Sequence, residues 1–167
     1  MITYNLIATT TVGSGGAASM DFTSIPATYT DLMLVVSGRA TTDNPTLYVY
    51  FNNDTTAANY TFRALNGDGA SASSSSATQA WFMRVVPSSA TASTFSNGIS
   101  YIPNYAGSTY KSVGTDSVTE NNATTAQLQL NAGLWSSTAA ITSIKLDPYG
   151  TDFAEFSSAS LYGISNS

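Results

Sequence analysis

The chain has 167 residues, of which 43 % are hydrophobic and 9 % charged, with a formal net charge of −5 and neither histidine nor cysteine. This length and hydrophobic share predict one folded domain with a sizeable core. Five cations are too few to neutralise a nucleic-acid backbone, and the missing imidazoles and thiols exclude disulfides, the usual zinc sites and most nucleophilic catalysis.

Residues 1–12 lack the basic start and the uninterrupted apolar stretch of a signal peptide. No apolar run approaches the roughly 18 residues that a membrane-spanning helix needs. We therefore expect neither a secretion signal nor a membrane span.

Apolar residues recur along the chain at a period of two and almost never at the helical period, which predicts strands and no sustained helix. Eleven stretches show this pattern, and we expect about nine or ten regular strands among them: 2–11, 17–23, 31–39, 46–52, 59–65, 79–86, 95–102, 109–118, 124–134, 140–147 and 158–164.

Three of these stretches are informative in detail. Residues 32–36 are continuously apolar, as expected for a strand buried on both sides. In 46–52, aliphatic residues and Phe51 alternate with Tyr48 and Tyr50, so both faces are apolar or aromatic. In 127–134 the leucines share one parity, and the glutamines and Asn131 share the other.

Turn-forming residues separate the strands at regular intervals, which is typical of a sandwich or a barrel. We predict an all-β fold, a single antiparallel, jelly-roll-like β-sandwich over residues 1–167. The stretch 67–78 is rich in Ser, Gly and Ala and is interpreted as a flexible loop that contacts a partner. A linker between two domains is the alternative, but neither flank has a closed set of strands.

Catalysis has few candidates. A serine nucleophile would need Lys111 or Lys145 as its base, and no motif supports such a pair. The acidic residues lie where turns need them, as do the oxygen-rich tips at 52–54 and 66–68 that calcium would otherwise suit. We therefore predict no enzyme activity, no cofactor and no metal.

Aromatic and apolar residues are the better candidates for a functional surface. Tyrosine and tryptophan suit cores, protein interfaces or sugar platforms, and we favour core or interface. The apolar N-terminal strand is expected either to add to a partner's sheet or to be the first strand of the sandwich. The interface candidates are Tyr4, Leu6, Tyr48, Tyr50, Trp81, Tyr105 and Trp135.

Several segments carry a resemblance to a known family. They are MITYNLIATTTVGS at the start, IPNY at 102–105, SVTENNATTAQLQLNAGLWSSTAAIT at 117–142 and SASLYGIS at 158–165. Together they resemble small virion structural proteins of tailed bacteriophages. The resemblance implies a β-sandwich on the particle, without enzymatic activity and without catalytic residues.

From this resemblance we expect a capsid decoration or cement protein located on the capsid surface. Its partners would be the major capsid protein and further copies of itself, with a homotrimer favoured, and neither nucleic acid nor membrane. The alternative is a carbohydrate- or receptor-binding module of a tail fibre or tail tip.

Overall fold

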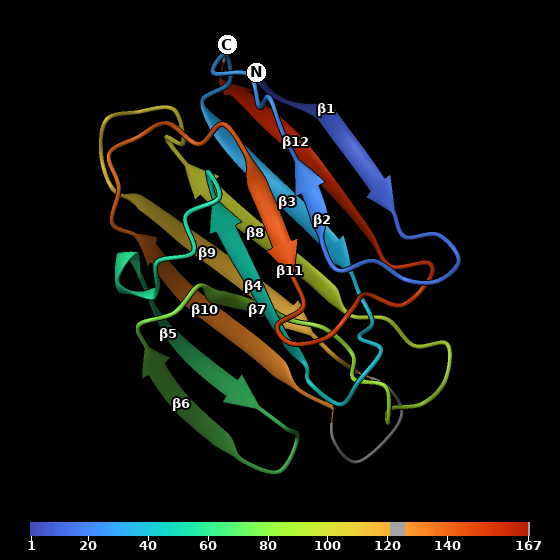
Figure 1. The fold of residues 1–167 in the computed structure, drawn as a ribbon. Coiled ribbons are helices and arrows are strands. Elements are labelled where there is room, and N and C mark those ends of the chain that lie inside the picture. The colour runs from blue at the N-terminus through green and yellow to red at the C-terminus, as the bar shows by residue number, and fades with distance from the viewer. Residues whose placement is uncertain (121–125, 167) are drawn as a thin grey trace.

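A computed structural model describes residues 1–120 and 126–166. Within them the chain forms twelve strands, arranged in an eight-stranded and a four-stranded antiparallel sheet (Figure 1). The elements are β1 (Ile2–Thr11), β2 (Met20–Phe22), β3 (Asp31–Ser37), β4 (Thr46–Phe51), the 3-10 helix η1 (Ala57–Asn59), β5 (Tyr60–Gly67), β6 (Ala72–Ala77), β7 (Trp81–Arg84), β8 (Asn97–Pro103), β9 (Lys111–Val118), β10 (Leu128–Trp135), β11 (Ile144–Asp147) and β12 (Ser158–Asn166). None of the helices in these residues is long and apolar enough to cross a membrane.

Eight of the strands form a jelly roll. The antiparallel pairs are nested, since β1 pairs with β12, β2 with β11, β3 with β8 and β4 with β7. A long hairpin that folds over itself in this way divides its strands alternately between two sheets. The order is β1-β12-β3-β8 in one sheet and β2-β11-β4-β7 in the other. The predicted jelly-roll-like β-sandwich is confirmed.

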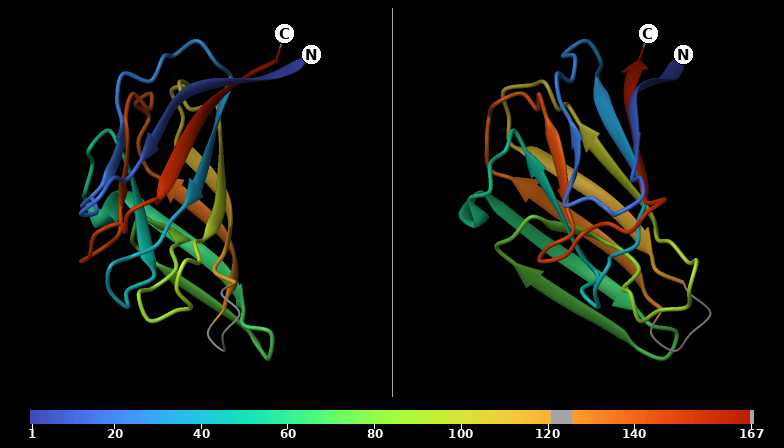
Figure 2. Two further views of the ribbon diagram at one scale, coloured as in Figure 1. Left: turned by 90° about the vertical axis from the view of Figure 1, so that its right-hand side faces the viewer. Right: turned by 45° about the vertical axis from the view of Figure 1, so that its right-hand side comes forward.

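The remaining four strands extend one sheet beyond the jelly roll. They continue it from β8 in the order β9-β10-β5-β6, and β7 of the small sheet contacts both β9 and β10. Figure 2 (left) shows the two layers edge-on, with the larger sheet on the right. The lower strands of the larger sheet extend beyond the edge of the smaller sheet. The large sheet is therefore wider than the layer that covers its inner face.

Strand β6 corrects one expectation, because it lies inside the stretch 67–78 that the sequence predicts as a loop. Its six residues pair with β5 from Phe62 to Gly67. A tight turn starts this hairpin, where Asp68 Oδ1 accepts the backbone N–H groups of Ala70 and Ser71 at 2.9 and 2.7 Å, and Gly69 has a φ of +85°. Both faces of β6 are exposed, so the strand has no buried parity and no hydrophobic pattern to reveal it.

One cluster of buried apolar side chains fills the space between the sheets. Its centre is aromatic: the rings of Phe51 and Trp135 lie 5.5 Å apart, and Tyr60 stacks on Trp135 at 6.4 Å. The Tyr60 hydroxyl accepts the Phe51 N–H at 3.0 Å and donates to the Asp54 carbonyl at 2.9 Å. Because the hydroxyl makes two hydrogen bonds, its burial does not carry the free-energy cost of an unpaired polar group.

Two of the five cations hold loops together, one of them half-buried and the other buried. The Arg39 guanidinium donates to four backbone carbonyls between residues 88 and 94, at 2.9 to 3.1 Å. Lys111 is buried, and its ammonium donates to the carbonyls of Gly107 and Thr109. Burial lowers the pKa of Lys111. A chain with few charges thus uses two of them as hydrogen-bond donors to its own backbone.

Candidate interaction surfaces

The extended half of the large sheet has an unusual polarity. In β10, Gln129 and Asn131 are buried between the sheets, whereas Leu128 and Leu130 are about half exposed on the outer side. The same holds in β9, where Thr115 and Ser117 point inward and are buried. A strand that covers a core normally turns its apolar residues inward. Here Leu128 and Leu130 face outward, although Trp135 at the end of β10 is buried in the core.

Some of the inward-facing polar groups have hydrogen-bond partners, whereas Ser117 Oγ, Gln129 Oε1 and Asn131 Oδ1 are buried without one. Asn131 Nδ2 donates to the Trp81 carbonyl at 2.9 Å, and Gln129 Nε2 donates to Asn66 Oδ1 at 3.0 Å. The hydroxyls of Ser100 and Thr115 lie 2.6 Å apart. The Asn131 bond ties β10 to β7 across the sandwich, whereas the other two bonds join neighbouring strands of the large sheet. With the amides of β10 on this inner side, its leucines point away from the core.

Cross-strand pairing collects the outward residues into rows, because directly opposed residues lie on one side of a sheet. One row crosses seven strands: Leu6, Tyr162, Met33, Tyr101, Gly114, Ala132 and Arg63. The next row contains Ser160, Val35, Ile99, Asp116, Leu130 and Leu65. The apolar face is defined here as Ile2, Tyr4, Leu6, Met33, Val35, Leu65, Ile99, Tyr101, Leu128, Leu130 and Tyr162.

The apolar face points away from the viewer in Figure 1, behind the four-stranded sheet. It contains a shallow depression of about 560 Å³, where Gly114 and Ala132 leave space between Leu65, Leu130 and Arg63. Three charged residues lie among its rows or at its margin. Asp116 is exposed directly between Ile99 and Leu130, and Arg63 lies opposite Ala132. Asp31 at the margin accepts a hydrogen bond from the Tyr101 hydroxyl at 2.8 Å. A partner that covers the face would therefore have to pair Asp116 and Arg63 with groups of opposite charge or polar groups, since unpaired buried charges are costly.

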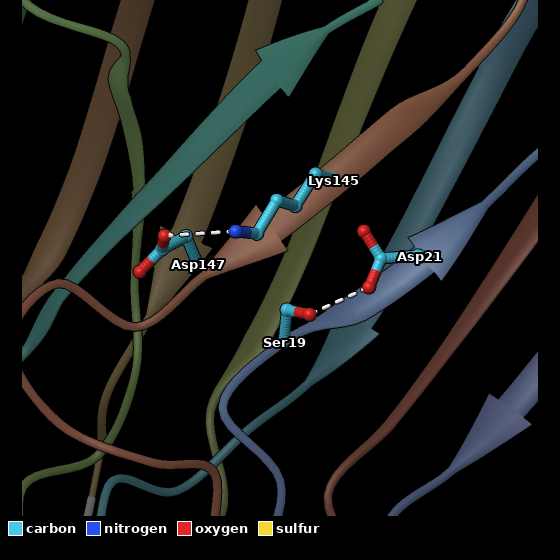
Figure 3. Close-up of polar contacts among 4 residues, drawn as sticks. All are labelled: Ser19, Asp21, Lys145 and Asp147. Carbon is cyan, nitrogen blue, oxygen red and sulfur yellow. Dashed lines mark hydrogen bonds and ion pairs between the residues drawn. The ribbon is translucent and has the colours of Figure 1, made fainter. Parts of the chain in front are cut away.

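The outer side of the four-stranded sheet is polar. Lys145 and Asp147 of β11 form an ion pair at 3.5 Å, and Ser19 donates to Asp21 next to it (Figure 3). Tyr50 lies directly opposite Lys145 in the ladder, in the same row as Asp21. The two outer surfaces of the sandwich thus differ: rows of exposed aliphatic residues lie on one, and an ion pair lies on the other.

The predicted interface candidates fall into three groups. Tyr4 and Leu6 are exposed at one end of the apolar face, in a strand that is also the first strand of the sandwich. The second group lies in the small sheet, where Tyr48 and Tyr50 share the outer side and Trp81 of β7 pairs with Tyr48. Tyr48 is only 8 % exposed, so it is largely unavailable to a partner. Trp81 is half-buried, packs edge-on against Phe62 at 5.3 Å and lies under the Arg84 guanidinium.

The third group corrects the prediction, since Tyr105 and Trp135 are not available to a partner in the folded domain. Both are buried in the core. Trp135 Nε1 donates to Asp54 Oδ2 at 2.9 Å, and the Tyr105 hydroxyl donates to the Pro26 carbonyl. An amphipathic aromatic ring suits a core and an interface equally, so composition alone does not separate the two.

The sequence reasoning missed most of the apolar face. Leu65, Ile99, Tyr101, Leu128 and Leu130 are its best-exposed members outside β1, and none was a candidate. The alternation in 127–134 was visible, but it says only that two faces differ. Which of them is covered depends on the position of the other sheet.

The oxygen-rich turns use their acceptors within the protein. Asn52 Oδ1 accepts the backbone N–H groups of Thr142 and Ser143, at 2.8 and 3.1 Å. Asp68 caps the β5–β6 turn. Among the described residues, no group of three or more acidic side chains is arranged to hold a metal ion.

A comparison with models of known protein families and with curated protein sequences finds no match to this chain.

Proposed function

We propose that this chain is a structural protein of a bacteriophage particle, and that it decorates the capsid by docking its apolar face on the major capsid protein lattice. The observation that carries the proposal is the outward orientation of the β10 leucines over a polar inner layer. Half-exposed aliphatic side chains in adjacent rows are costly in water and are typical of a surface that a partner covers.

The size of the face supports stable docking. Eight of its side chains are between 37 and 63 % exposed: Ile2, Tyr4, Leu6, Leu65, Ile99, Tyr101, Leu128 and Leu130. At on the order of 100 Å² each, they present about 800 Å², the area that one partner contributes to a standard interface. Monomers seldom expose patches of more than roughly 300–600 Å².

The free energy of such docking is sufficient. Burying about 800 Å² of apolar surface contributes about 20 kcal/mol before costs are subtracted. Loss of translational and rotational freedom costs roughly 4–15 kcal/mol. Asp116 and Arg63 on the face add a desolvation cost unless the partner pairs them, and with such pairing the surplus favours a stable complex.

The polar opposite side fits the same arrangement. If the apolar face is covered, the surface that carries Lys145, Asp147 and the tyrosines remains in contact with water. A repeated lattice offers equivalent sites around its symmetry axes, and we therefore expect a homo-oligomer on the particle, with a trimer favoured.

Binding to empty shells tests the proposal directly. Shells of the major capsid protein would be assembled without this chain and sedimented with the purified wild-type protein or with Leu130→Glu. We expect the wild type to sediment with the shells and Leu130→Glu to lose at least tenfold in affinity, because a carboxylate would be buried without a partner. The matched control is Thr23→Glu, an exposed change after β2 that should bind like the wild type.

Two results would overturn the decoration role. One is unchanged binding of Leu130→Glu, which would remove the apolar face from the contact. The other is a particle reconstruction that places the chain at the tail in a few copies, because decoration of a shell requires many. In that case the tail becomes the location, and the tail-fibre or tail-tip alternative is favoured.

A further inference from the structure

A small hollow lies on the polar side of the molecule, away from the apolar face. It has a volume of about 230 Å³ and is lined by Tyr48, Tyr50, Thr55, Ala57, Gln79, Ala80 and Tyr149. Three of these residues are tyrosines, although the chain has only ten. None of the seven belongs to the apolar face.

Local structure positions the three rings. Tyr48 and Tyr50 lie two residues apart in β4 and therefore project to the same side, with ring centroids 5.6 Å apart in an edge-on arrangement. Tyr149 comes from the turn after β11, and its ring lies 4.7 Å from that of Tyr48. This turn is closed by the Thr151 N–H donating to the Pro148 carbonyl at 2.9 Å.

The turn that carries Tyr149 is held in two further ways. Gly150 occupies its third position with a φ of +73°, which a residue with a side chain would adopt only under strain. Asn44 Nδ2 donates to the Tyr149 carbonyl at 2.7 Å. The ring is thus presented by a fixed backbone, although about half of it is exposed.

The hydroxyls of these three tyrosines are not used inside the protein. Within residues 1–120 and 126–166, none of them has a protein hydrogen-bond partner. Three other tyrosines contrast with them, since the hydroxyls of Tyr60, Tyr101 and Tyr105 each bind a protein group: Tyr60 to Asp54, Tyr101 to Asp31 and Tyr105 to Pro26. Tyr48 is only 8 % exposed, so the accessible aromatic surface comes mainly from Tyr149 and Tyr50. The hollow therefore combines this surface with free donors and acceptors.

The charges around the hollow favour a neutral ligand. Asp147 lies opposite Tyr48 in the ladder, and its carboxylate is only partly neutralised by Lys145 at 3.5 Å. Burial, and then the charge of Asp147, raise the pKa of Tyr50 to about 12, so its hydroxyl remains a donor at neutral pH. An anionic ligand would meet a carboxylate beside protonated phenols, with one cation already paired.

We propose that this hollow binds one ring of a neutral carbohydrate. Sugar rings combine an apolar C–H face, which packs on aromatic rings, with hydroxyls that need donors and acceptors at the edge. Gln79 and Thr55 supply further polar groups at the margin. The volume is below the roughly 300–1,000 Å³ of sites for drug-sized ligands, which matches a single ring at the end or along the side of a glycan.

A glycan array tests the inference, using the wild-type protein on neutral hexose and N-acetylhexosamine oligosaccharides and on sialylated ones. We expect retention on neutral glycans, confirmed by calorimetry with the retained oligosaccharide. Tyr149→Ala should lower the affinity about tenfold or more, whereas Tyr149→Phe, which keeps the ring, should lose only a few-fold. The matched control is Tyr110→Ala, because Tyr110 is similarly exposed and lies outside the hollow.

Tyr149 is half exposed, so its truncation should leave the melting temperature nearly unchanged and a loss of binding can be assigned to the site. The inference is overturned if no neutral glycan is retained, if only sialylated glycans are retained, or if Tyr149→Ala binds as tightly as the wild type. Capture of aromatic peptides in place of glycans would also overturn it. These results are independent of shell binding by the apolar face.

Discussion

The orientation of β10 leads to a prediction about stability that distinguishes an outward leucine from an inward one. Leu130 of β10 and Leu34 of β3 both belong to the large sheet, but Leu130 is 52 % exposed and Leu34 is 0 % exposed. Replacing each of them with a smaller side chain should therefore have very different costs in the isolated protein.

The costs can be worked out from burial. Complete burial of a leucine side chain contributes roughly 1.5–3 kcal/mol, so Leu130→Thr should lower the free energy of unfolding by about 1 kcal/mol. The high strand propensity of threonine offsets part of this loss. Leu34→Ala removes the same kind of side chain from the core and leaves a cavity, for which roughly 3–5 kcal/mol is expected.

Urea unfolding of dilute protein, followed by the fluorescence of Trp81 and Trp135, measures both costs. Equal slopes against urea would show that the two variants unfold to similar states. A loss for Leu130→Thr as large as that for Leu34→Ala would refute the reasoning, because a shift of the β10 register by one residue would bury the leucines. A loss for Leu130→Thr that grows with protein concentration would instead indicate that copies cover the face.

Two further predictions concern packing and one hydrogen bond. Gly133→Ala should lower the free energy of unfolding in urea by about 1–3 kcal/mol, since the new Cβ would lie 2.6 Å from the Phe82 ring. Gly114→Ala on the open outer face should leave it unchanged or raise it slightly, and equal effects of the two variants would contradict the packing described. Burial acts to raise the pKa of Asp54, but hydrogen bonds from Trp135 and other donors outweigh it, so the pKa lies below the ordinary 3.8. The ionised carboxylate therefore stabilises the fold above pH 3.8. This contribution is lost as the pH falls through the pKa of the folded state. Trp135→Phe should raise the Asp54 pKa in an NMR titration and move acid unfolding to higher pH, and an unchanged pKa would rule out this bond.

Much of the fold follows from local patterns in the chain. All eleven predicted stretches overlap described strands, although the structure shortens some of them, as for 140–147, where β11 begins at Ile144. Strand β6 was not predicted because its residues are exposed on both faces and show no hydrophobic alternation. In 32–36 the pattern indicated burial on both sides, but only Leu32, Leu34 and Val36 are buried, and Met33 and Val35 are half-buried on the apolar face.

The sequence predicted fewer of the residues that form the candidate surfaces. Tyr4 and Leu6 are exposed, and Tyr50 is half-buried on the outer side of the small sheet, but Tyr48 on the same side is buried. The partner of the two strand tyrosines in the hollow, Tyr149, comes from a turn about one hundred residues further along the chain. Such a meeting depends on β4 and β11 being neighbours in the small sheet, which no local pattern encodes.

The amino-acid sequence by itself determined that the chain forms many short strands with two unlike faces, because alternation at a period of two is a local property of the backbone. Only the tertiary structure decided which face is inside. In β10 the side that meets β7 holds Gln129 and Asn131, whose amides bond to Asn66 and the Trp81 carbonyl. The leucines face outward because a strand's inner side is set by what packs across it, and that layer comes from distant parts of the chain.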